Sequence, residues 1–184
     1  MDTEKKLSSG KQHNFTKDLR DGKKAEEELH TYFVKECLWG NATRTQGNDS
    51  RYDIEVPGID LGSNAPLRFE VKWDKYSSIS NRIAIEIGKR NPSNPKELTE
   101  FSGIMTSQAD YWAILARGDW YIAPRLSLRE YAFKMNLEQP KLFPSLWAGD
   151  GRRARNILVP LEYITKQDFF TPIALESRIC EGFQ

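Results

Sequence analysis

The chain has 184 residues, of which 39% are hydrophobic and 29% are charged, and its formal net charge is +1. This length suits one globular domain with a working core, and two cysteines, Cys37 and Cys180, are too few for a disulfide framework or a zinc cluster. The near-neutral balance argues against a protein that coats nucleic acid along its length, although it leaves room for a local basic groove.

The N-terminal residues 1–15 are polar, with a modest positive excess and no apolar period. We therefore expect a flexible basic arm there, followed by a single domain over residues 16–184. The arm lacks the apolar segment of a secretory signal, and no apolar run in the chain is long enough to cross a bilayer. A cytoplasmic protein with no membrane partner is the expectation.

The rest of the chain predicts alternating helices and strands. Apolar residues at helical spacing predict a helix from Gly22 to about Gly40, and period-two alternation predicts strands at 52–56, 68–73 and 82–87. A helix at 102–110 and a hairpin of 111–115 with 120–123 follow. Ser127 and Glu130 have capping-box spacing for a helix to about Met135, and 156–159 resembles a last strand. This order predicts an α/β (α+β) fold around one mixed sheet.

Strand alternation gathers charged residues on one side of that sheet. If the first two strands pair with their apolar faces together, Asp53, Glu70 and Lys72 emerge on the opposite side. Two carboxylates beside a core cost desolvation and repulsion unless a cation or substrate compensates.

Carboxylates on adjacent strands suit Mg²⁺, which takes oxygen ligands and lowers the pKa of a bound water. A lysine on the same side of the strand is placed to orient or help deprotonate that water, or to stabilise charge on a phosphorane. The residue types and their spacing therefore predict phosphodiester hydrolysis.

These residues resemble a known group of nucleases. Asp53, sixteen intervening residues and then Glu70-Val71-Lys72 resemble the core of the PD-(D/E)XK nuclease superfamily, although Tyr52 stands in place of the signature proline. Residues 22–29 resemble the first helix of archaeal Holliday-junction resolvases and their phage relatives, in which a glycine precedes a helical Glu of the metal site. By that spacing Glu26 is the match, with Glu27 as the alternative.

The resemblance implies a restriction-endonuclease-like αβββαβ core with a central mixed sheet flanked by helices. It also implies a DNA substrate, branched or duplex, and dependence on Mg²⁺, for which Mn²⁺ is a substitute. Glu26, Asp53, Glu70 and the carbonyl of Val71 would hold the metal, and Lys72 would position or activate water. By analogy we expect a homodimer with two sites, acting in the cytoplasm, including that of a phage-infected cell.

Several assignments stay open at this stage. Asn48 and Asp49 are rivals of Asp53, and Glu86 is a candidate accessory ligand. Thr106 and Gln108 either bring a hydroxyl and an amide group near the site or simply belong to the start of a helix at Gly103. The candidate DNA-binding residues, which are otherwise a solvated surface, are Lys23, Lys24, Arg152, Arg153 and Arg155.

The function has open alternatives too. A site-specific homing or restriction-type endonuclease and a non-catalytic DNA-binding module on the same fold are the alternatives to a junction-resolving enzyme. RNA is the alternative substrate.

Overall fold

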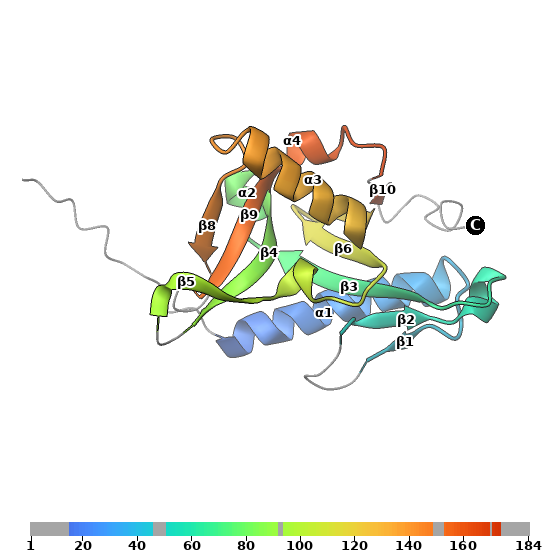
Figure 1. Cartoon of the computed structure of the whole chain (residues 1–184). Coiled ribbons are helices and arrows are strands. Elements are labelled where there is room, and N and C mark those ends of the chain that lie inside the picture. The colour runs from blue at the N-terminus through green and yellow to red at the C-terminus, as the bar shows by residue number, and fades with distance from the viewer. Residues whose placement is uncertain (1–14, 46–50, 92–93, 149–152, 170, 174–184) are drawn as a thin grey trace, which may run out of the picture.

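The protein is described by a computed structural model over residues 15–45, 51–91, 94–148, 153–169 and 171–173. Two sheets form its framework (Figure 1). The central six-stranded sheet has the order β1-β2-β3-β6-β7-β10, and its strands are β1 (Thr43–Arg44), β2 (Ile54–Val56), β3 (Leu67–Asp74), β6 (Tyr111–Ala116), β7 (Asp119–Pro124) and β10 (Thr171–Ile173). The second, four-stranded sheet consists of β5 (Asn94–Phe101), β4 (Arg82–Asn91), β9 (Ala154–Pro160) and β8 (Ser145–Ala148), in that order.

The predicted α/β class with a central mixed sheet is confirmed. Strand β3 runs antiparallel to β2 and parallel to β6, so one strand joins both kinds of pairing. All pairs in the second sheet are antiparallel. The helices are α1 (Phe15–Lys35), α2 (Ser77–Ser80), α3 (Arg125–Glu138) and α4 (Leu161–Ile164), and the 3₁₀ turns are η1 (Gly58–Leu61) and η2 (Gly103–Met105).

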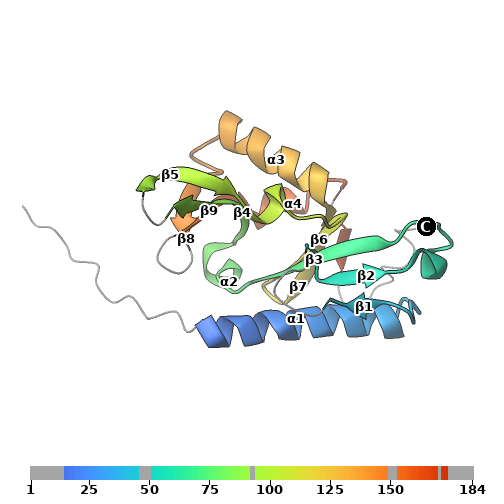
Figure 2. The same ribbon diagram turned by 60° about the horizontal axis from the view of Figure 1, so that its bottom comes forward.

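Helix α1 covers one face of the central sheet (Figure 2). Its predicted stripe is correct, because Leu29 and Phe33 are fully buried in a cluster that includes Ile54 and Phe69. The helix begins earlier than its predicted start at Gly22, which lies within it. An interior glycine costs a helix about 1 kcal/mol, and burial of the apolar stripe offsets that cost. The predicted arm, apart from Phe15, lies outside the described residues.

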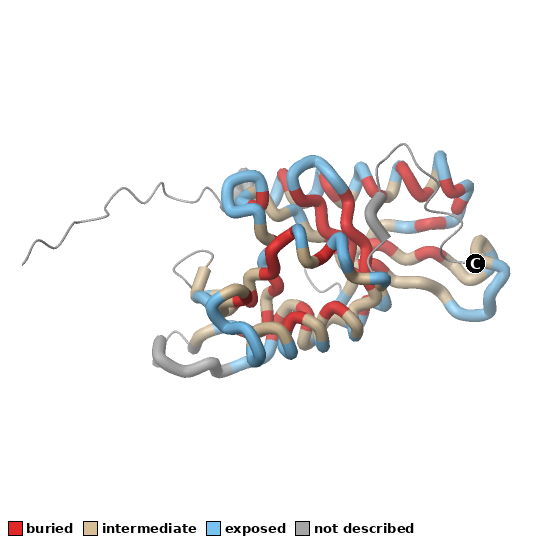
Figure 3. The backbone as a smooth tube through the Cα atoms, turned by 90° about the horizontal axis from the view of Figure 1, so that it is seen from above, coloured by how far each residue is buried: buried red, intermediate tan, exposed pale blue. Residues whose placement is uncertain are grey.

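A second core fills the opposite face of the central sheet. Trp112 and Ile114 of β6 pack there with Ile85 of β4 and Ile157 of β9, so this core joins the two sheets. The buried stretches in Figure 3 follow the crossing strands, whereas the turns are exposed. Helix α3 covers this core; it starts at Arg125, directly after Pro124, and has no side-chain cap. The capping-box prediction was therefore wrong, because the helix begins before Ser127.

The third predicted strand leaves the central sheet. Strand β4 pairs with β5 and β9 in the second sheet. The segment that connects β3 to β4 is held by the carboxylate of Asp74, at the end of β3. This carboxylate accepts backbone N–H groups from Tyr76 at 3.0 Å, Ser77 at 3.1 Å and Ala84 at 2.7 Å. One side chain thus ties together the end of β3, the short helix α2 and the beginning of β4.

The helix predicted at 102–110 is wrong. Only the 3₁₀ turn η2 forms there, because this segment is rich in Ser, Thr and Gly, which have weak helix preference. Gly103 has φ +58°, and a Cβ at this position would lie 2.5 Å from the carbonyl oxygen of Glu86. A glycine is required here because the turn packs directly against the backbone of β4.

Two glycine substitutions separate this close approach from backbone strain alone. Gly62 has nearly the same φ, +62°, but nothing lies within 4 Å of its Cβ position. We expect Gly62→Ala to lower the free energy of unfolding by about 1 kcal/mol from the left-handed backbone. Gly103→Ala should lower it by about 3 kcal/mol, because steric overlap adds to that strain. Urea unfolding of both variants measures the difference, and equal losses would contradict the packing of η2 on β4.

Candidate active site

The pairing of β2 with β3 places Asp53 beside Glu70. Ile54 lies opposite Phe69 in the ladder, and the N–H of Asp53 donates to the Phe69 carbonyl at 2.8 Å, which extends the pairing by one residue. The Asp53 carboxylate also accepts the Val71 N–H at 2.7 Å. Backbone geometry therefore fixes this carboxylate at the edge of β3, as strand alternation predicted.

Glu70 and Lys72 lie on the same face of β3. The Lys72 amine donates a hydrogen bond to Glu70 and forms an ion pair with it. The Lys72 side chain is 44% exposed and that of Glu70 only 14%, so Glu70 is the more enclosed partner of the pair. The Lys72 Nζ lies 5.7 Å from the centroid of the Trp112 ring, whose core-facing position supports the lysine stem.

Burial makes the charged carboxylates costly. It is the main cause that raises the pKa of Glu70, and the nearby Asp53 raises it further. Burial likewise raises the pKa of Asp53, with Glu26 adding to the effect, and Lys72 opposes the rise at both groups. Burial alone would lower the pKa of Lys72, but Glu70 and Asp53 outweigh it and the net shift is upward. Lys72 therefore carries its proton at neutral pH.

Glu26, on α1, borders this cluster. Burial raises its pKa, and Lys72 and Glu70 are among the groups that it senses. Its carboxylate lies 3.7 Å from the Arg44 guanidinium. Glu27 also approaches Arg44, at 3.9 Å, but its side chain is 71% exposed, against 23% for Glu26. Of the two neighbours, Glu26 is therefore the one that faces the site.

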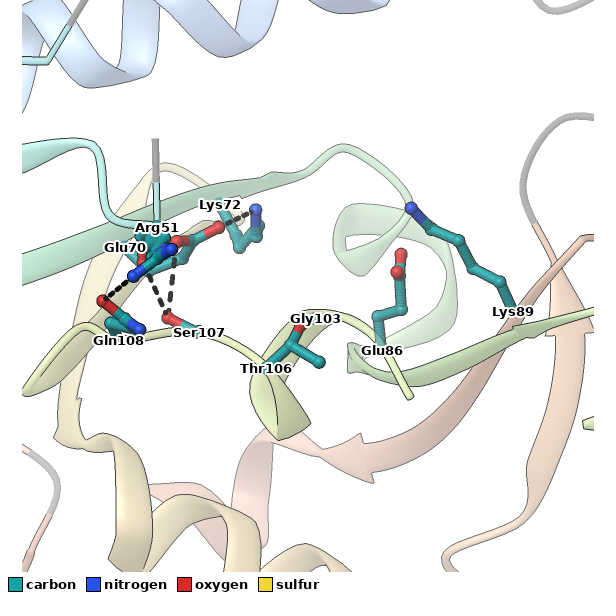
Figure 4. Close-up of a pocket in the computed structure, with 9 residues that line it drawn as sticks. All are labelled: Arg51, Glu70, Lys72, Glu86, Lys89, Gly103, Thr106, Ser107 and Gln108. Carbon is teal, nitrogen blue, oxygen red and sulfur yellow. Dashed lines mark hydrogen bonds and ion pairs between the residues drawn. The ribbon is translucent and has the colours of Figure 1, made fainter. Parts of the chain in front are cut away.

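The cluster opens into a pocket of about 500 Å³. Glu70 and Lys72 lie at one end, and Glu86 and Lys89, from the second sheet, lie at the other (Figure 4). Glu86 accepts a hydrogen bond from the Ser102 hydroxyl at 2.7 Å, which orients its carboxylate. The full lining is Arg51, Glu70, Lys72, Glu86, Lys89, Gly103, Thr106, Ser107 and Gln108.

The structure brings some of the predicted residues together and separates others. Asp53, Glu70 and Lys72 form one cluster with Glu26 at its border, and Glu86, Thr106 and Gln108 do belong to the site region as pocket residues. In the described part of the chain, no group of three or more His, Cys, Asp or Glu side chains is arranged to hold a metal ion. Asp49, the rival of Asp53, and its neighbour Asn48 lie outside the described residues.

The predicted DNA-binding residues do not form one patch. Lys23 and Lys24 are exposed on α1, whereas Arg153 and Arg155 belong to the second sheet region, and Arg152 lies outside the described residues. Arg155 donates to the Ser145 hydroxyl at 2.7 Å and lies 5.5 Å from the centroid of the Trp147 ring. Arg90 lies over the same ring at 4.1 Å.

Sequence reasoning missed several polar residues at the site. Arg51 and Ser107 line the pocket, and Ser107 approaches the Glu70 carboxylate at 3.5 Å. The Arg51 guanidinium donates to the Gln108 side chain at 3.2 Å. Arg44 and Lys89 were also missed. Their only sequence signal is positive charge, which 27 residues of the chain share.

Comparisons with known proteins assign no family. No family model matches the chain, and no curated protein matches it. A solved structure of a bacterial homing endonuclease, I-Ssp6803I, is similar over 59% of this chain and 72% of its own, with 14% identity and a TM-score of 0.40. Separately, none of the helices in the described residues has both the length and the apolar character needed to cross a membrane.

The raised pKa of Asp53 has a measurable consequence for stability. Its carboxyl group contributes stability that is complete below its ordinary pKa of 3.8 and is lost as the pH rises through the raised value. Asp53→Asn keeps an oxygen acceptor for the Val71 N–H but carries no charge. We expect this variant to gain stability relative to the wild type as the pH rises from about 4 to 8.

Urea unfolding in EDTA across this pH range measures the effect. Asp168→Asn, at an exposed position, is the control and should show no such trend. A constant difference between Asp53→Asn and the wild type would contradict a costly buried charge at residue 53.

Proposed function

We propose that the protein is a metal-dependent DNA endonuclease that hydrolyses phosphodiester bonds. One observation carries the proposal: Glu70 is hydrogen-bonded to the protonated Lys72 at the wall of an open pocket, and a second carboxylate, Asp53, is held beside them by the Val71 N–H. A fold gains no stability from enclosing two like charges, so the arrangement favours a ligand that compensates them.

The chemistry of the donors suits a hard divalent cation, although their side chains are not arranged as a metal site in the described structure. Asp53 and Glu70 supply carboxylate oxygens, the ligands that Mg²⁺ prefers, and Glu26 borders them as a third. We propose that these three residues, with the Val71 carbonyl, hold Mg²⁺ or Mn²⁺. The bound cation would supply activation of water and neutralisation of phosphate charge. To bind the cation, Glu26 would exchange its ion pair with Arg44 for the metal. This ion pair is partly exposed and therefore weak.

Lys72 is suited to act as a cation. Its raised pKa keeps the amine protonated, so it would donate hydrogen bonds to the attacking water or to a phosphate oxygen rather than remove a proton. Lys72 could exchange its present partner, the Glu70 carboxylate, for a phosphate oxygen at little cost in Coulomb energy, because both partners are anionic. Arg51 and Lys89 add positive charge elsewhere in the pocket, where neighbouring phosphates of a strand would lie.

The second sheet supports nucleic acid as the substrate. Arg90 of β4 and Arg155 of β9 both pack on the ring of Trp147, on β8. The ring thus keeps two cations close together. Arg153 is exposed beside them. Such a surface suits contacts with phosphates outside the pocket. We propose a branched-DNA substrate first and a site-specific duplex cut as the alternative, with a homodimer supplying two sites for cleavage of both strands.

Cleavage assays test the chemistry. Wild type, Glu70→Gln and Lys72→Met are incubated with supercoiled plasmid, linear duplex, a four-way junction and a structured RNA, in Mg²⁺ or EDTA. We expect Mg²⁺-dependent cutting that falls at least about 100-fold in both variants, because each removes a group at the reacting centre. Lys134→Met, on the exposed side of α3, is the matched control. Binding without cutting on every substrate would overturn the enzyme assignment, and cutting of RNA alone would overturn DNA as substrate.

A neighbouring pair of variants tests Glu26. Glu26→Gln should lower the cleavage rate about 10- to 100-fold, because it removes a bordering carboxylate from the site. Glu27→Gln changes the next residue of the same helix and should leave the rate within about twofold of the wild type. The opposite order of effects would make Glu27 the site residue.

Metal binding can be measured without cleavage. A ligand that binds only the folded state raises its unfolding temperature, so Mg²⁺ or Ca²⁺ should stabilise the wild type in thermal melts. The increase should disappear in Asp53→Asn and Glu70→Gln and persist in Lys134→Met. An equal increase in all four proteins would contradict a metal site at these carboxylates.

A further inference from the structure

A second, larger pocket lies on the other face of β3, beside α1. It has a volume of about 920 Å³, and successive residues of the strand divide between the two pockets: Lys72 lines the first and Trp73 the second. Successive residues of a strand point to opposite faces of the sheet, so the two pockets open on opposite sides of β3. The lining of the second pocket is Arg20, Asp21, Lys24, Trp73, Asp74, Lys75, Tyr76, Ser77, Ser78, Arg117 and Gly118.

The anionic groups of this pocket are already engaged within the fold. Asp21 is buried and accepts a hydrogen bond from the Lys75 amine at 2.6 Å. Asp74 accepts the three backbone N–H groups that secure the β3–β4 turn. The lining thus contains two carboxylates, both hydrogen-bonded within the fold, against the four cationic side chains of Arg20, Lys24, Lys75 and Arg117.

The remaining charge on the pocket wall is positive. Arg20 and Lys24 are both exposed and lie one helical turn apart on α1. Arg117, in the turn between β6 and β7, donates to the neutral side-chain oxygen of Asn81 at 2.7 Å, so its charge is not cancelled. The wall thus presents an excess of positive charge to a ligand.

Two aromatic rings are exposed among these cations. Trp73 is 39% exposed and Tyr76 is 57% exposed. The Lys75 amine lies 5.0 Å from the centroid of the Trp73 ring, which supports the ring from one side. Large aromatic side chains at such exposure, rather than in a core, are typical of binding surfaces.

We propose that this surface, the aromatic platform formed by Arg20, Lys24, Trp73, Tyr76 and Arg117, binds an unpaired strand of DNA. The inference rests on the proposed nuclease function and narrows its substrate to DNA with a single-stranded or branched segment. Bases within a duplex are stacked on one another and offer no free face to Trp73 or Tyr76, whereas unpaired bases do. The cations would follow the phosphates of the same strand.

The platform is tested by binding in EDTA, in the Glu70→Gln background, with fluorescence anisotropy. The probes are an oligothymidylate of about 16 nucleotides and a blunt duplex of the same length. Trp73→Ala and Tyr76→Ala should each weaken single-strand binding about 5- to 150-fold, the range for loss of one stacked base, and should lower the ratio of single-strand to duplex affinity. Ile79→Ala, which is 85% exposed on α2 outside the pocket lining, is the matched control and should change neither.

The charged residues are tested through salt dependence. Arg20→Gln with Lys24→Gln should reduce the slope of log affinity against log salt for the oligothymidylate by about 1.4, because two phosphate contacts are lost. Both substitutions are at exposed positions of α1, so the fold tolerates them independently of the aromatic variants.

Specific results would overturn the platform. These are unchanged single-strand affinity in both aromatic variants, an equal loss on duplex and single strand, or competition by polyglutamate that Trp73→Ala abolishes, which would indicate an acidic protein partner. Because binding is measured without metal or cleavage, these results are independent of the nuclease assay. Cutting that is retained while platform binding fails would reject only the platform, and single-strand binding without any cutting would reject only the nuclease.

Discussion

The antiparallel pairing of β2 with β3 is the constraint on which the candidate site depends. Two hydrogen bonds connect Asp53 to the backbone of β3. The Asp53 N–H donates to the Phe69 carbonyl, and the Asp53 carboxylate accepts the Val71 N–H. Because this carboxylate is held by the backbone of β3, its position relative to Glu70 and Lys72 does not depend on side-chain packing. Burial of Ile54 and Phe69 beneath the same strands stabilises the pairing, so the core and the site share one register.

The electrostatics follow from that register. Each of the two enclosed carboxylates makes ionisation of the other more costly, and the protonated Lys72 beside them offsets only part of that cost. Under the proposed function, a bound cation and a phosphate would supply the missing counter-charges. The fold tolerates the imbalance because both core clusters, one on each face of the central sheet, are extensive and apolar.

The sequence was sufficient to predict the parts of the site that depend on local periodicity. Alternation along residues 52–56 and 68–73 placed Asp53, Glu70 and Lys72 on one side. These positions follow from the repeat of a strand and need no knowledge of distant contacts. Glu26, in contrast, was identified by the resemblance to resolvases and not by periodicity alone.

The far wall of the pocket was predicted only in part, because Glu86 was a candidate from the sequence whereas Lys89 was not. Glu86 and Lys89 reach it because β4 pairs with β9, a strand about 70 residues later whose register no local pattern specifies. The turn at Gly103 was mistaken for a helix, because its left-handed backbone is imposed by close contact with β4 and not by its own residues. Non-local packing therefore decides how the pocket closes, while local pattern decides where its reactive groups lie.

The hydrogen bonds of Asp74 give the molecule a mechanical property. This carboxylate links the end of the first sheet to the beginning of the second across the short segment of residues 75–81, so it restrains how the two sheets move relative to each other. Lys72 belongs to the first sheet and Lys89 to the second, so the hydrogen bonds of Asp74 help to hold the two ends of the pocket in place relative to each other. The length of residues 75–81 is therefore a constraint on the site, because an added residue there would displace the N–H groups that Asp74 holds.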